Sequence, residues 1–110
     1  MKIVTKLSLI TALLISSASV LAVDAKANYD RHCAKCHGPD GKGQTRMGRQ
    51  AGVKDYTDPK VQAEMKDEEA FKSIKEGQTV NGKEAMKPFG DKVSDEEIKA
   101  LVAYVRAFKK

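Results

Sequence analysis

The sequence is 110 residues long, with 20 basic residues, 15 acidic residues and a net charge of +5. This length allows one domain. The basic residues are spread along the chain, and there are three phenylalanines, three tyrosines and no tryptophan. Neither a basic stripe nor a set of stacking aromatic side chains for nucleic acid is evident, so nucleic-acid partners are set aside.

The first residues of the chain, 1–22, have the pattern of a secretory signal peptide. A short basic region is followed by an apolar run and then by small residues. Val20 and Ala22 occupy the recognition positions for cleavage after Ala22, and cleavage after Ala25 is the alternative. A retained membrane anchor is less well supported, because the apolar run is shorter than the roughly 20 residues of a spanning helix and contains several serines. We therefore expect residues 23–110 to form the mature domain, exported to the periplasm and not inserted in the membrane.

The next feature is the stretch Cys33–His37, which we call the CxxCH motif. With His32, it contains both cysteines and both histidines of the chain. The preceding segment is predicted to be helical, with Asp24 as a candidate cap. Three kinds of site share these residue types: a redox dithiol, a zinc site and a covalent haem attachment site.

The surroundings of the motif favour the third kind of site. A thioredoxin-like dithiol requires a helix N-terminus after a buried strand, and the segment before Cys33 has no strand pattern. A zinc ion requires four ligands arranged tetrahedrally, and residues 32–37 are too close together to surround it. The spacing C-x-x-C-H instead indicates covalent attachment of haem, with both thiols bonded to the haem vinyl groups and His37 as an axial iron ligand.

A haem iron also has a second face, which methionine can occupy. Met86 lies in "GKEAMKPFG", a segment stiffened by proline and glycine, and it is the predicted second ligand. Met47 and Met65 are predicted to fill the core, where lone methionines are common. His32 is a poor candidate, because it is adjacent to Cys33 on the same side of the ring as His37.

The most regular predicted helix lies near the C-terminus. Ser94 and Glu97 form a capping box. From there, apolar residues repeat at helical spacing and form one stripe: Ile98, Leu101, Val102, Val105 and Phe108. A shorter helix is predicted from residue 67 to Gly77, with one apolar face formed by Ala70, Phe71 and Ile74. The segments 38–52 and 77–90 are predicted to be ordered loops.

Three stretches together, "CAKCHGPDGKG", "AMKPFG" and "SDEEIKALVAYVRAF", resemble a class I c-type cytochrome of the small, soluble bacterial or photosynthetic monohaem type. The resemblance implies an all-α fold with about four short helices around one covalently bound haem, and with crossing N- and C-terminal helices. It places Tyr29 on one side of the crossing and Leu101 and Tyr104 on the other.

The same resemblance implies a ligand set and a cofactor. One haem c would be attached through Cys33 and Cys36, and His37 and Met86 would be the axial metal ligands. Many relatives have a proline whose carbonyl accepts a hydrogen bond from the axial histidine. No proline lies between Pro39 and Pro59 in this chain, so the acceptor is unassigned, and a carbonyl within residues 47–52 is a candidate.

The implied function is electron transport by a monomeric protein that is not an enzyme. The expected partners are redox proteins (a membrane oxidoreductase, an oxidase or a soluble dehydrogenase) that dock briefly at the haem edge. Four lysines near the predicted attachment and ligand segments are candidates for steering such partners: Lys35, Lys42, Lys83 and Lys87. The alternative is a haem enzyme or a gas-binding protein with a labile or open sixth iron position.

Overall fold

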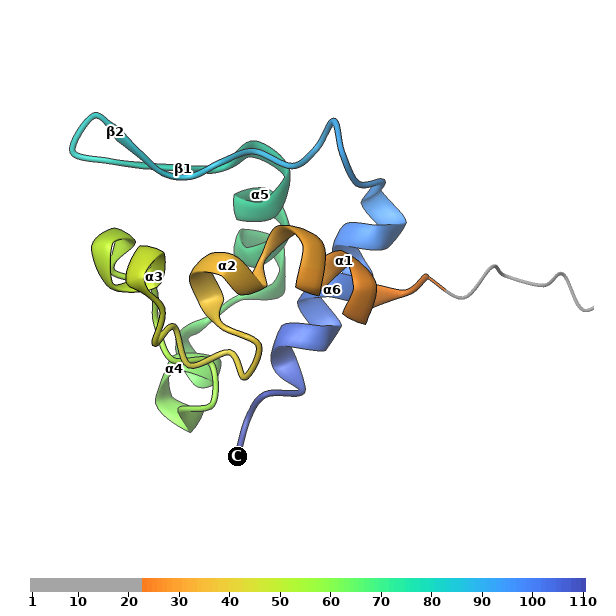
Figure 1. Cartoon of the computed structure of the whole chain (residues 1–110). Helices are drawn as coiled ribbons and strands as arrows, with labels where there is room; N and C mark the ends of the chain where they lie inside the picture. The colour runs from red at the N-terminus through yellow and green to blue at the C-terminus, as the bar shows by residue number, and fades with distance from the viewer. Residues whose placement is uncertain (1–22) are drawn as a thin grey trace, which may run out of the picture.

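A computed structural model describes residues 23–110, and the predicted signal peptide, residues 1–22, lies outside the described part of the chain. The elements are, in order, α1 (Ala25–His32), α2 (Ala34–His37), α3 (Arg46–Ala51), α4 (Pro59–Glu64), α5 (Asp67–Glu76), β1 (Gln78–Val80), β2 (Lys83–Met86) and α6 (Asp95–Arg106). Figure 1 shows the short helices gathered around α1 and α6, with the β-hairpin extending to one side. The predicted helical class is confirmed. The described residues form more helices than the predicted four or so, and α3 lies where a loop was predicted.

Helices α1 and α6 cross at the centre of the domain, as predicted (Figure 1). Tyr29 of α1 is fully buried at this crossing, and its ring centroid lies 4.9 Å from that of Tyr104 and 5.3 Å from that of Phe108. Ile98 and Leu101 of α6 are also fully buried. Aromatic pairs at these distances stabilise a contact beyond their apolar burial, so Tyr29 anchors the crossing.

Side chains at their N-termini fix both crossing helices. The Asp24 carboxylate accepts a hydrogen bond from the Ala27 N–H at 3.0 Å and caps α1. Ser94 and Glu97 form the predicted capping box of α6, with bonds of 3.1 Å and 3.0 Å in the two directions. Each cap satisfies an N–H group that the helix leaves free.

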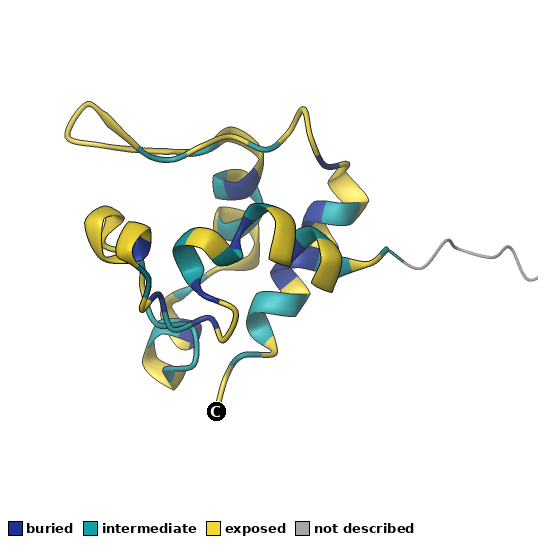
Figure 2. Cartoon of the chain, in the orientation of Figure 1, coloured by how far each residue is buried: buried dark blue, intermediate teal, exposed yellow. Residues whose placement is uncertain are grey.

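Helix α5 packs on α6 and leads directly into the hairpin. Strands β1 and β2 are antiparallel, with Gln78 opposite Met86. The turn between them contains Asn81 and Gly82, both at positive φ, and an Asn-Gly pair of this kind favours a tight hairpin turn. The hairpin lies in a segment predicted to be a loop, and Figure 2 shows that it is largely exposed.

The buried apolar core of the described residues is small. It consists of Tyr29, Cys33, Ile74, Val93, Ile98, Leu101 and Val102. In Figure 2, buried positions lie in α1, α5 and α6 and also in the loop after α2, in α3 and in α4. A cysteine of the CxxCH motif is therefore part of the main core.

Candidate functional site

The CxxCH motif forms a single helical turn directly after α1. The carbonyl of Cys33 accepts hydrogen bonds from the N–H groups of Cys36 at 3.2 Å and His37 at 2.9 Å. Gly38 closes the turn by donating its N–H to the Ala34 carbonyl at 2.8 Å. Both thiols and the imidazole are thus brought together on one turn, as the spacing predicts.

Hydrogen bonds from other segments of the chain hold the main chain of this turn in place. The carbonyls of residues 36–38 each accept a hydrogen bond from another segment. In chain order, the donors are the Thr45 hydroxyl at 2.7 Å, the Gly43 N–H at 2.7 Å and the Tyr29 hydroxyl at 2.6 Å. Because three successive carbonyls are bonded, the direction of the turn is fixed relative to α1 and to the loop after α2.

Helix α3 packs its main chain against the same turn through Gly48. A Cβ atom at Gly48 would collide with the Cys36 carbonyl oxygen and would lie 2.6 Å from the Gly43 carbonyl oxygen. Both neighbours are main-chain atoms, so they cannot move aside as a flexible side chain could. The absence of a side chain at Gly48 therefore allows α3 to contact the motif.

The two thiols differ in environment. Cys33 is 9% exposed and Cys36 is half-buried, and both are free thiols. Burial raises the pKa of Cys33 to about 11, because it disfavours the thiolate. Redox-active dithiols depend on a lowered thiol pKa, so this environment argues against the dithiol interpretation.

The imidazole of His37 is enclosed by protein. Its Nδ1 atom is buried and has no hydrogen-bond partner among the described residues. Burial lowers the pKa of His37, because the imidazolium form is disfavoured away from water. The neutral form is the one that binds metals. The candidate carbonyls within residues 47–52 therefore do not accept a hydrogen bond from Nδ1. The ring instead lies beside Tyr56, with centroids 5.4 Å apart.

Met86 ends β2 and packs, half-buried, against the core that contains Cys33. Its main chain lies close to Gly77, where a Cβ atom would lie 2.5 Å from the Met86 carbonyl oxygen. The segment after it is tied to the end of α5, since Phe89 and Gly90 donate their N–H groups to the carbonyls of residues 74 and 75 at 2.8 and 3.1 Å. The hairpin and these bonds hold Met86 against the core.

The other methionines and the second histidine lie in different surroundings. Met47 is 40% exposed on α3, so the prediction that it fills the core is wrong. Met65 is half-buried between α4 and α5. His32 packs on Phe89, with ring centroids 5.5 Å apart. This contact joins the end of α1 to the segment that follows Met86.

The four candidate docking lysines are accessible to different degrees. Lys35, Lys83 and Lys87 are exposed, and Lys42 is half-buried. Lys83 and Lys87 belong to the hairpin and the segment after it, whereas Lys35 lies on α2. A role in docking stays a prediction for all four.

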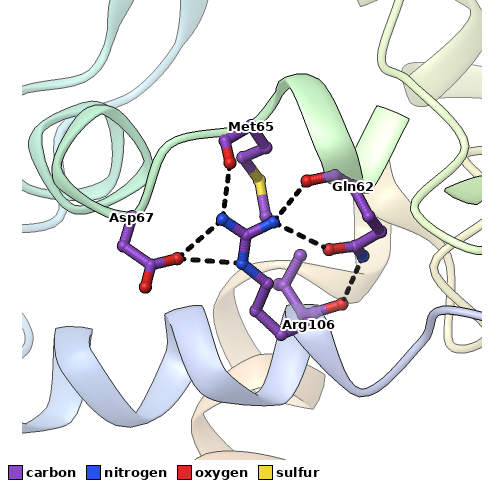
Figure 3. Close-up of polar contacts among 5 residues, drawn as sticks. Gln62, Met65, Asp67 and Arg106 are labelled. Atoms are coloured by element: carbon purple, nitrogen blue, oxygen red, sulfur yellow. Dashed lines mark hydrogen bonds and ion pairs between the residues drawn. The ribbon is translucent and has the colours of Figure 1, made fainter. Parts of the chain in front are cut away.

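A polar cluster between α4, α5 and α6 was not predicted from the sequence (Figure 3). The Arg106 guanidinium donates to the Asp67 carboxylate at 2.8 Å and to the carbonyls of Gln62 at 2.6 Å and Met65 at 2.5 Å. Gln62 is only 5% exposed, and its amide donates to the carbonyl of Tyr56 at 2.7 Å. These residues are far apart in the sequence, so no local sequence pattern indicates the cluster.

Within residues 23–110, no group of three or more histidine, cysteine, aspartate or glutamate side chains is arranged to hold a metal ion. The zinc interpretation therefore lacks a ligand set in this part of the chain.

Of the helices described, none is both long enough and apolar enough to cross a membrane.

The residues of the motif fit a covalently bound haem. Cys33 and Cys36 form no disulfide and lie on one turn with a buried imidazole whose lowered pKa favours the neutral form. The unpartnered buried Nδ1 atom of His37 is costly for a histidine that only fills the core. A thioether, that of Met86, packs against the same core. These are the donor types that c-type haem requires.

Comparisons with known proteins agree with this chemistry. The sequence matches the family model described as "Cytochrome C oxidase, cbb3-type, subunit III" over residues 21–105. The structure is similar to that of the "KustC0563 c-type cytochrome", with 41% sequence identity, a TM-score of 0.72, and coverage of 80% of this chain and 100% of the other. It is also similar to a tyrosine-to-phenylalanine mutant titled Kustc0563, with 39% identity, a TM-score of 0.70 and coverage of 79% and 100%. A search of curated proteins finds no significant match.

Proposed function

This chain belongs to the c-type cytochrome family described as cbb3-type cytochrome c oxidase subunit III, and on that premise we propose that it is a periplasmic carrier of single electrons. The family implies a covalently bound haem c and an electron-transfer role. The finer proposal is one haem, attached through Cys33 and Cys36, with His37 and Met86 as axial ligands. The observation that supports it best is the single turn that presents two free thiols and a buried imidazole whose Nδ1 atom has no hydrogen-bond partner among the described residues.

A bound haem c supplies a centre that gains and loses one electron. The residues of this chain have distinct tasks in the proposal. The two thiols hold the group by covalent bonds, and the three externally bonded carbonyls of residues 36–38 keep His37 from changing position. Met86 is anchored on a separate segment and would supply the second axial ligand. With both ligands held by the protein, electron transfer would require little reorganisation of these residues.

Partner recognition in this proposal is brief and electrostatic. The partners are redox proteins, such as a membrane oxidoreductase, an oxidase or a soluble dehydrogenase, and the carrier acts as a monomer. Exposed Lys35, Lys83 and Lys87 would steer an acidic partner to the haem edge. Steering of this kind weakens as salt screens the charges. The predicted signal peptide, residues 1–22, would deliver the chain to the periplasm.

The test is an optical spectrum of the exported protein in both oxidation states, with a far-red scan for the weak sulfur-to-ferric-iron band and a carbon monoxide challenge. We expect a low-spin spectrum with that band and no reaction with carbon monoxide. Met86→Ala should abolish the band and admit carbon monoxide while haem stays attached. Met47→Ala is the matched control, because Met47 is exposed on α3, and it should leave the spectrum unchanged.

The attachment is tested separately. Cys33→Ala and Cys36→Ala should each lower the yield of haem-containing protein in a host that matures c-type cytochromes. Unchanged yields in both variants would contradict the proposed attachment. A high-spin wild-type spectrum that shifts with carbon monoxide would instead support the haem enzyme or gas-binding alternative.

A further inference from the structure

The aromatic ring beside His37 belongs to Tyr56, in the segment between α3 and α4. The two ring centroids lie 5.4 Å apart, with an angle of 37° between the ring planes. Tyr56 is half-buried, and burial raises the pKa of its phenol. Among the described residues, it is the aromatic side chain recorded in ring contact with the proposed axial histidine.

The main chain of Tyr56 is fixed on both sides of its side chain. Its N–H donates to the Gly41 carbonyl at 2.8 Å. Its carbonyl accepts from the Gln62 side chain at 2.7 Å. Gly41 lies in the loop after the CxxCH motif, so the first bond joins Tyr56 to the segment that also holds the His37 carbonyl.

Gln62 is in turn held by α6. Its amide also donates to the Val105 carbonyl at 2.9 Å. Arg106 donates to its side-chain oxygen at 3.2 Å and to its main-chain carbonyl at 2.6 Å (Figure 3). Gln62 is 5% exposed, so these bonds form away from water and restrict it strongly. A continuous series of hydrogen bonds therefore runs from α6 to the main chain of Tyr56, whose ring lies beside His37.

The imidazole of His37 lacks the restraint that usually orients a metal-bound histidine. Such a histidine almost always donates its second ring N–H to a carbonyl, a carboxylate or water, and this bond fixes the plane of the ring. The Nδ1 atom of His37 has no such partner in the described protein. Packing against a neighbouring ring is the restraint that the structure supplies in its place.

We propose that Tyr56 is a positioning residue for His37, whose ring, held in place through Gly41 and Gln62, sets the orientation of the imidazole plane. This inference rests on the proposed role of His37 as an axial ligand. In this proposal Tyr56 does not contact the haem and acts on His37 through packing alone. The phenyl ring of a phenylalanine should therefore replace it, whereas an aliphatic side chain should not.

The test uses haem-loaded ferric protein and nuclear magnetic resonance of the haem ring methyl groups. The order and spread of these resonances depend on the orientation of the axial ligand planes, so a general loss of stability does not mimic the effect. Tyr56→Leu should change the order or the spread of the methyl resonances and shift the reduction potential. Tyr56→Phe should restore the wild-type pattern. Tyr104→Leu is the control, because it removes an aromatic ring from the α1–α6 crossing, and it should leave the pattern unchanged.

The outcomes separate this inference from the proposed function. If wild-type protein shows the sulfur-to-iron band and Tyr56→Leu retains the wild-type methyl pattern, the positioning role is wrong and the electron-carrier proposal stands. An equal change in Tyr104→Leu would also overturn the positioning role. Wild-type protein without attached haem would overturn both. If Tyr56→Leu gives no haem-loaded protein, Tyr56→Ile is measured in the same way.

Discussion

The amide of Gln62 allows a stability prediction that does not depend on the identity of the cofactor. Gln62→Leu retains a similar volume at a position that is 5% exposed, but it removes two donated hydrogen bonds, to the carbonyls of Tyr56 at 2.7 Å and Val105 at 2.9 Å. It also removes the side-chain acceptor for Arg106. The bonds that Arg106 makes to main-chain carbonyls and to Asp67 stay.

The loss in the free energy of unfolding depends on which hydrogen bonds each carbonyl still accepts after the substitution. The Val105 carbonyl still accepts from the Phe108 N–H at 3.2 Å, so its loss is that of one ordinary hydrogen bond, about 0.5–1.5 kcal/mol. The Tyr56 carbonyl loses the hydrogen bond recorded for it, and an unsatisfied buried acceptor costs about 1–3 kcal/mol. The expected loss in the free energy of unfolding is therefore about 1.5–4.5 kcal/mol.

Guanidinium unfolding of the haem-loaded protein, followed by circular dichroism, measures this loss. With a slope of about 3 kcal/mol per molar for a domain of this size, the midpoint should fall by about 1 M. Gln50→Leu is the matched control, because Gln50 is an exposed glutamine on the short helix α3. A substitution there should change stability by less than about 0.5 kcal/mol. If Gln62→Leu fell within the same narrow range, the polar cluster would not stabilise the fold as argued.

Two further predictions concern the CxxCH motif and the α6 cap. Gly48→Ala should destabilise the protein by about 1–3 kcal/mol, because the added Cβ meets main-chain oxygens of the motif and overpacks the contact; an unchanged midpoint in the same unfolding assay would contradict this close contact. Hydrogen bonds from the Ser94 N–H and from the Asn28 side chain lower the pKa of Glu97 below its ordinary value of 4.5. The carboxylate therefore contributes stability above that value and loses it as the pH falls through the lower folded pKa. Unfolding curves at several pH values should show the deficit of Glu97→Gln shrinking in acid, and a deficit independent of pH would contradict this account.

Local signals in the sequence predicted the helices that have strong caps and clear periodicity. Ser94 and Glu97 lie three residues apart before an apolar stripe, and both bonds of the capping box are present in the structure. Gly77 ends α5 as predicted. The contact of Tyr29 with Tyr104 was implied by the resemblance to class I cytochromes and is also present. In each case the signal lies within one helix or within a recognisable family motif.

The elements that were missed depend on weaker or more distant signals. The β-hairpin had a local signal, since Asn81-Gly82 is a strong turn pair, but its strands are short and exposed and lack apolar alternation. Helix α3 begins at a Thr45 cap whose hydroxyl also bonds the Cys36 carbonyl, so its stability depends partly on tertiary contacts. The Gln62–Arg106 contact joins residues 44 positions apart, and no periodicity or motif indicates it.

The two proposed axial ligands, His37 and Met86, are held in place by different segments of the chain. His37 belongs to a turn whose main chain is bonded to α1, to the Gly43–Thr45 loop and, through the contact of Gly48, to α3. Met86 depends on a short hairpin and on main-chain bonds from residues 89 and 90 to the end of α5. The hairpin is mostly exposed and adds little apolar burial, and segments with few buried contacts open at the lowest free-energy cost. In the proposed carrier, the Met86 ligand should therefore detach before the CxxCH motif is disturbed, so that covalent attachment and the sixth ligand respond separately to denaturant.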